Sequence, residues 1–179
     1  PIALFSMSDS SICVDDCITI TNLSTNDTAW QWTFEGGDPN ASTLDQPTTI
    51  CFDSIGNYSI ELIVSNSFGA DTTTLNIEVN AAPTIAIDNE DSLLIDKGTS
   101  VTITPTGTGI SYTWSPPTWL SCIACPSPIA TPEETITYIV NITDTNGCNS
   151  SDSITVIVDE TISVYLPNSF TPDGDGVND

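Results

Sequence analysis

The feature that most constrains the fold is an internal repeat of strand-like segments. Superposing Gly69 on Gly147 aligns YSIELIVSNSFGADTTTLNIEV with ITYIVNITDTNGCNSSDSITVIV, with one inserted residue in the second copy. Both copies alternate apolar with polar residues and are rich in Ile, Val and Thr, which is the pattern of half-buried β-strands. A repeat of about eighty residues that holds several short strands is typical of tandem β-sandwich modules.

The rest of the sequence fits the same fold class. Runs such as CITITNL, SVTITPT and DSITVIVD also alternate at period two, and no segment has the 3.6-residue periodicity of a helix. We therefore predict an all-β chain of tandem β-sandwich modules, with residues 1–80 in the first module, 81–160 in the second and 161–179 in the start of a third unit. The connecting segment VNAAPTI is short and contains Pro83, so we expect an elongated rod with limited bending.

Two aromatic segments, WQWTF and SYTWS, lie in the middle of the modules. We predict that Trp32 or Trp30, and Trp114, fill the space between two packed sheets, because such residues are more often core than ligand platforms. Trp119 follows SPPT and is the best candidate for an exposed aromatic side chain on which a sugar could stack. An exposed Trp119 would favour a carbohydrate-binding module, and a buried one would argue against it.

The charge of the chain excludes several classes of function. The sequence has 24 acidic residues, one basic residue (Lys97) and no His, for a formal net charge of -23. We expect no nucleic-acid partner, because no cations are available to neutralise phosphates, and no binding to an anionic membrane surface. No stretch approaches the roughly 20 apolar residues that span a bilayer, so we expect no direct membrane insertion.

The same composition limits catalysis. Without His or Arg the chain can form neither a Ser-His-Asp or Cys-His centre nor a guanidinium clamp. Carboxylate-pair chemistry, as in glycosidases, remains compatible with the composition, but no sequence feature places two carboxylates in one cleft. We therefore predict that these residues are not an enzyme.

Six cysteines are divided equally between the modules and are candidates for disulfides: Cys13, Cys17, Cys51, Cys122, Cys125 and Cys148. A secreted chain forms disulfides by default. We expect one bridge within each module, with Cys122–Cys125 or Cys122–Cys148 in the second. The third thiol of each module has three open alternatives, which are to stay free, to pair across the modules, or to pair between chains.

The segment DGDGVND contains Asp173, Asp175 and Asp179 at a D-x-D-G-x-x-D spacing. Alternating carboxylates with intervening glycines can wrap oxygen ligands around calcium, and Val177 could add its carbonyl oxygen. The alternative is a solvated turn in which Asp and Gly only supply turn geometry. Calcium is the one cofactor that the sequence suggests.

The motifs of the first module resemble the PKD domain common in surface proteins of the Bacteroidetes. The W-x-F-G-D-G stretch and the G-x-Y-x-V-x-L-x-V-x-N-x-x-G strand of that family are matched, with departures, by Trp32, Phe34, Gly36, Gly37, Asp38, Gly56, Tyr58, Ile60, Leu62, Val64, Asn66 and Gly69. The second module resembles the Ig-like repeats of gliding-associated adhesins. LPNSFTPDGDGVND is similar to the start of the gliding motility-associated C-terminal domain, the type B sorting signal of type IX secretion, with Asp173 in place of the usual Asn.

These resemblances imply a non-catalytic, extracellular, surface-attached protein, with these residues forming the C-terminal part of a long type IX-secreted adhesin or extracellular filament subunit. The implied partners are like modules of the same or neighbouring chains, in a homo-oligomer or filament, or a surface glycan, prey or substratum ligand. The alternative is that these are accessory modules of a secreted hydrolase whose catalytic domain lies upstream, since PKD domains also accompany such enzymes.

Overall fold

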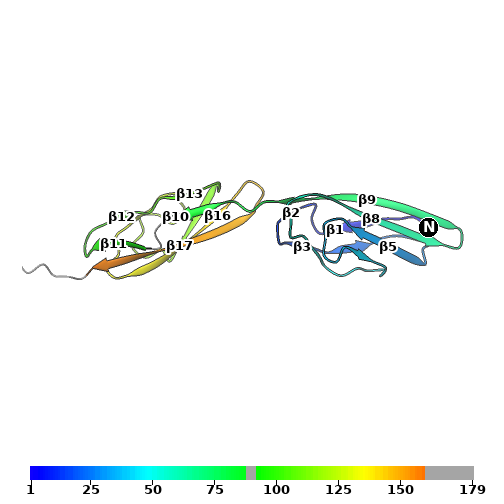
Figure 1. The fold of residues 1–179 in the computed structure, drawn as a ribbon, viewed down its shortest axis with the longest axis horizontal. Helices are drawn as coiled ribbons and strands as arrows, with labels where there is room; N and C mark the ends of the chain where they lie inside the picture. The colour runs from blue at the N-terminus through cyan, green and yellow to red at the C-terminus, as the bar shows by residue number, and fades with distance from the viewer. Residues whose placement is uncertain (88–91, 160–179) are drawn as a thin grey trace, which may run out of the picture.

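The computed structural model describes residues 1–87 and 92–159, and these residues form two β-sandwiches placed end to end along one long axis (Figure 1). The described residues contain strands and no helix, so the all-β prediction is confirmed. It follows that they also contain no helix long and apolar enough to cross a membrane. The first module ends with β9 at Asn80 and the second begins with β10 at Ile85, on either side of the linker that contains Pro83.

The first module packs a five-stranded sheet against two short strand pairs. The sheet has the order β2-β9-β8-β5-β6, in which β2 is parallel to β9 and the other pairs are antiparallel, and the facing pairs are β1-β4 and β3-β7. The strands are β1 (Phe5–Met7), β2 (Ser11–Cys13), β3 (Cys17–Ile18), β4 (Ile20–Asn22), β5 (Ala29–Phe34), β6 (Ala41–Ser42), β7 (Ile50–Cys51), β8 (Gly56–Asn66) and β9 (Gly69–Asn80).

The second module repeats this topology. Its main sheet has the order β11-β17-β16-β14, again with the first pair parallel, and the facing pairs are β10-β13 and β12-β15. The strands are β10 (Ile85–Ile87), β11 (Ser92–Asp96), β12 (Val101–Thr102), β13 (Pro105–Gly107), β14 (Ser111–Ser115), β15 (Ile129–Ala130), β16 (Ile136–Thr143) and β17 (Asn149–Asp159). Only β6 has no counterpart among the described strands, so the sequence repeat reflects a repeated fold.

Each module has its own hydrophobic core, built from the inward positions of the alternating strands. Trp32 and Trp114 are the largest side chains in these cores and are 0% and 2% exposed. Each indole Nε1–H donates a 2.9 Å hydrogen bond to a backbone carbonyl, that of Leu44 in the first module and that of Cys125 in the second. Trp30 is only partly buried, so the central core residue of the first module is Trp32.

The first segment of each module is held to its last strand by an aspartate. The backbone N–H of Ala3 donates to Asp71 Oδ2 at 2.8 Å, and that of Ile87 donates to Asp152 Oδ2 at 2.8 Å. The N–H of Ala3, and then that of Thr72, lower the pKa of Asp71 below its ordinary value of 3.8, while desolvation opposes this shift. Hydrogen bonds to the charged form of a carboxyl group are the physical cause.

We predict that the first segment is released from β9 in acid. Since the pKa of Asp71 is lower in the folded chain, the carboxylate stabilises the fold above pH 3.8 and this contribution is lost as pH falls through the lowered pKa. An NMR pH titration should therefore show the amide proton of Ala3 losing its hydrogen-bonded chemical shift below pH 3.8, and Asp71→Asn should weaken the same bond at neutral pH. A midpoint at or above 3.8 would contradict this assignment.

Candidate functional site

The most distinctive site in the structure is the junction between the two modules. It brings together the end of β2, the end of β9 and the loop between β16 and β17 (Figure 1). Cys13 at the end of β2 forms a disulfide with Cys148 in that loop, with an S–S distance of 2.04 Å, a Cα–Cα distance of 5.6 Å and a sequence separation of 135 residues. The two modules are therefore joined twice, by the linker and by this bridge.

Hydrogen bonds around the bridge also cross the junction. The Nδ2–H of Asn146 donates to Asn80 Oδ1 at 3.1 Å, which links the second module to the last residue of β9. The Nδ2 group of Asn80 in turn donates to Ser11 Oγ at 2.9 Å, on β2. Cys148 is fully buried, and its backbone N–H donates to Asp144 Oδ1 at 2.9 Å. These contacts hold the disulfide in an ordered loop rather than on a loose tether.

The other four cysteines pair within their modules. Cys17 and Cys51 are directly opposite each other on β3 and β7 and form a disulfide, and Cys122 and Cys125 form the second. The structure thus has one bridge inside each module, and in the second module it has the first of the two expected pairings. The third thiols pair across the modules, and the odd cysteine count of each module is the sequence signal for this bridge.

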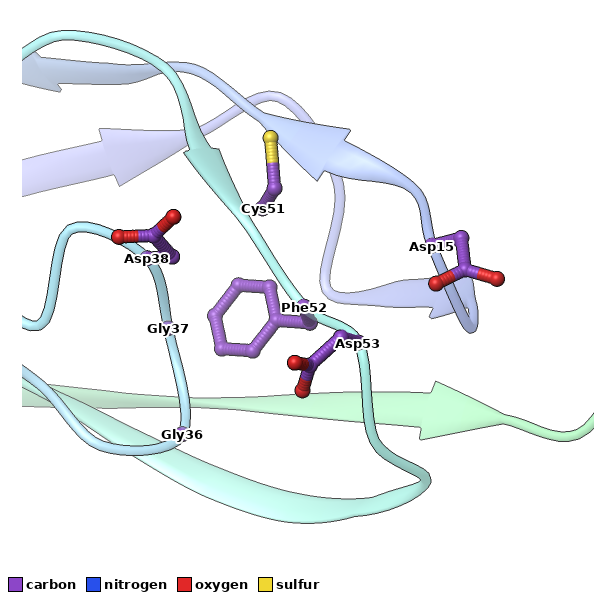
Figure 2. A pocket seen from close by; sticks show the side chains of 7 residues that line it. All are labelled: Asp15, Gly36, Gly37, Asp38, Cys51, Phe52 and Asp53. Carbon is purple, nitrogen blue, oxygen red and sulfur yellow. The ribbon is translucent and has the colours of Figure 1, made fainter.

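A second feature is a shallow acidic pocket of about 240 Å³ in the first module, lined by Asp15, Gly36, Gly37, Asp38, Cys51, Phe52 and Asp53 (Figure 2). The aspartates come from three segments of the chain, and Figure 2 shows their side chains well apart rather than converging on one point. No group of three or more His, Cys, Asp or Glu side chains within residues 1–87 and 92–159 is placed to hold a metal ion.

The two glycines of this pocket have a packing role. Gly36 has φ +68, and a Cβ atom there would overlap the ring of Tyr58. A Cβ on Gly37 would lie 2.6 Å from Ile50 Cγ2. Tyr58 also stacks on Phe52, with ring centroids 5.6 Å apart. The glycines that match the PKD motif therefore allow the turn after β5 to pack on an aromatic pair, and their role is in the fold.

The remaining predicted site residues are Trp119 and the proposed calcium ligands. Trp119 is partly buried and has φ +62, and its carbonyl accepts a 2.9 Å hydrogen bond from the N–H of Thr131, so it is held in place rather than displayed as an open platform. Sugar stacking on Trp119 stays a prediction. The proposed calcium ligands Asp173, Asp175, Val177 and Asp179 lie outside the described residues, as does the whole unit 161–179.

Comparison with known proteins identifies the first module. Residues 8–79 match the PKD domain, so the chain contains a PKD domain followed by an Ig-like β-sandwich module. Modules of these types are non-catalytic and typical of extracellular adhesion or accessory proteins, and the disulfides agree with an oxidising, extracellular setting. No curated protein matches the chain.

Several solved structures are similar to the chain at low identity. The fibronectin(III)-like modules of CbhA from Clostridium thermocellum are 12% identical over 87% of this chain and 94% of theirs, with a TM-score of 0.40. Extracellular domains 3–5 of Drosophila OTK are 14% identical over 88% of this chain and 62% of theirs, with a TM-score of 0.45. The insect immune protein hemolin is 18% identical over 84% of this chain and 45% of its own, with a TM-score of 0.39. These likenesses carry no inference about function.

We predict that Gly36→Ala destabilises the first module more than backbone strain alone would. Gly98 has a similar positive φ of +86, and no atom lies within 4 Å of the position that a Cβ would take there, so Gly98→Ala is the matched control. Gly98→Ala should lower the free energy of unfolding by about 1 kcal/mol, and Gly36→Ala by about 2–4 kcal/mol because Tyr58 must also move. Urea unfolding followed by circular dichroism measures both, and equal losses would show that the contact with Tyr58 is unimportant.

Proposed function

We propose that this chain is a stiff, non-catalytic stalk segment of a long extracellular adhesion protein or surface filament. The single observation that carries the proposal is the Cys13–Cys148 disulfide, which fixes two modules end to end. A module that only displayed a ligand site would have no need of a covalent lock on its orientation. A segment that must keep a distant domain at a defined reach from the cell does need one.

The physical effect of the bridge is to remove bending at the junction. Domains that share one short linker are expected to move relative to each other, because inter-module contacts are usually small. A second covalent connection, with Asn80 and Asn146 bonded beside it, closes a ring through both modules and removes that freedom. The high negative charge supports the same role, since it keeps an exposed rod soluble and separate from its neighbours.

The proposal also includes how the chain is exported and how it is attached to the cell surface. The similarity of LPNSFTPDGDGVND to the start of a type B sorting domain supports type IX secretion and attachment at the cell surface. Calcium bound by Asp173, Asp175, Val177 and Asp179 would stiffen the start of that unit, because it would tie the loop through several carboxylates. The PKD and Ig-like modules then act as the spacer that precedes the attachment unit.

The test is whether the disulfide sets the stiffness of the rod. In ¹⁵N relaxation measurements at low concentration, the wild-type modules should tumble as one elongated body. The double substitution Cys13→Ser with Cys148→Ser should give two separately tumbling bodies, and X-ray scattering should show a broader distribution of long distances. The bridge contributes through the constraint on the chain rather than through either core.

The matched control is Cys17→Ser with Cys51→Ser, which removes a disulfide inside the first module. This variant should lose about 2–4 kcal/mol of stability in that module and keep the common tumbling of both. If the Cys13→Ser, Cys148→Ser variant also tumbles as one body, the bridge does not set the stiffness and the stalk proposal loses its main support.

A further inference from the structure

We propose that the Cys13–Cys148 disulfide carries tension along the rod, so that a pull on the chain bypasses almost all of both sandwiches. The covalent route for that tension, here called the load path, consists of residues 1–13, the disulfide and residues 148–159. This inference rests on the proposed stalk function, because a stalk that holds a distant domain is pulled along its axis. Stiffness against bending and resistance to pulling are separate properties, and each has its own test.

The positions of the two cysteines along the chain define the load path. Cys13 is the last residue of β2, and Cys148 immediately precedes β17, with a sequence separation of 135 residues. The bridge therefore closes a covalent loop that contains residues 14–147, and of the described strands only β1, β2 and β17 lie outside this loop. While the bridge is intact, a pull is transmitted from one sulfur atom to the other, and no residue of the loop can be drawn out into the length of the rod.

The load path has little slack in the folded chain. Residues 1–13 run from the far pole of the first module to the junction, and β17 (Asn149–Asp159) runs from the junction to the far pole of the second module (Figure 1). A β-strand rises about 3.3 Å per residue, whereas a fully extended chain spans at most about 3.3–3.6 Å per residue. Since β17 is one continuous strand, the load path through the second module is already close to its greatest length.

Without the bridge, tension would have to cross each sandwich. It would enter the second module through the linker at β10 and leave along β17, and these two strands belong to different sheets. A hydrogen bond of 2.8 Å from the N–H of Ile87 to Asp152 Oδ2 joins them. In the first module, tension would pass to β9 through the bond from Ala3 to Asp71 and the short parallel pairing of β2 with β9. These attachments are few, so the unbridged modules should unfold when they are pulled.

The bridge is also shielded from thiols on one side. Thiol–disulfide exchange begins when a thiolate attacks one of the two sulfur atoms, so its rate depends on access. Cys148 is fully buried, and its backbone N–H donates to Asp144 Oδ1 at 2.9 Å. In contrast, Cys17 is exposed, and Cys122 and Cys125 are only partly buried. The disulfide on the load path is thus the one with a fully buried cysteine, which suits a lasting link.

Single-molecule stretching of the full chain, held by handles at its two termini, tests the load path. The oxidised wild type should lengthen without any step of the size of a module. Cys13→Ser with Cys148→Ser should show two unfolding steps, because each module is then under tension. The step of the second module should be about 200–250 Å, and that of the first about 100 Å shorter, because the Cys17–Cys51 disulfide withholds 34 residues from the extension.

The matched control is Cys17→Ser with Cys51→Ser, which removes a disulfide that lies inside the covalent loop. This variant is less stable in the first module, but it should stretch like the wild type, because the load path is unchanged. A module-sized step in the oxidised wild type, or in this control, would overturn the proposal. So would a Cys13→Ser, Cys148→Ser variant that stretches without such steps.

The result can be separated from that of the relaxation experiment. Relaxation in the absence of force reports whether the modules tumble together, while stretching reports which covalent route carries the tension. If the wild type tumbles as one body but yields module-sized steps, the load path is wrong although the rod is stiff. If the Cys13→Ser, Cys148→Ser variant unfolds in steps but tumbles as one body, the load path is right and the bridge is not what makes the rod stiff.

Discussion

The Cys13–Cys148 disulfide is the interaction on which the arrangement of the chain depends. Each sandwich has its own core and its own internal bridge, so neither needs the other in order to bury its apolar side chains. Without the cross-module bond, the linker between β9 and β10 would be the only covalent connection between the two modules. With it, the end of one module and the hairpin loop of the other form a single covalent ring, and the direction of the second module is set by the first.

The repeated topology explains why one disulfide is enough to fix the direction of the second module relative to the first. In both modules the long hairpin runs the full length of the sandwich, so its loop is at one pole and the end of its last strand is at the other (Figure 1). A neighbour joined to the last strand must therefore present its own hairpin loop to the junction. Asn80 and Asn146 meet for this reason, and a single cysteine on each side is enough to bond the two modules.

The sequence predicted most of what depends on local pattern. The alternation in β8 and β16 indicated half-buried strands, and Ile60, Leu62 and Val140 on the inward side of these strands are fully buried. The alternation could not show whether Trp30 or Trp32 is the core residue. Residues two apart lie on the same face of a strand, and which of them is buried depends on their position along it. Trp32 lies opposite Leu62 in the middle of the sheet, while Trp30 lies nearer the hairpin loop. The cross-module disulfide was also beyond local pattern, since it depends on how two separately folded bodies meet.

The same distinction between local and non-local information applies to the candidate site. The PKD motif is visible in the sequence, but the sequence does not show what its glycines do. Their packing role follows only from the structure, in which the ring of Tyr58 lies against Gly36. Phe68 is likewise ordinary in sequence, and only the fold shows that its side chain is 94% exposed on the loop between β8 and β9, away from the junction (Figure 1). In a chain of repeated modules, the contact between modules is the one that local pattern cannot predict, and its sequence signal is the odd number of cysteines in each module.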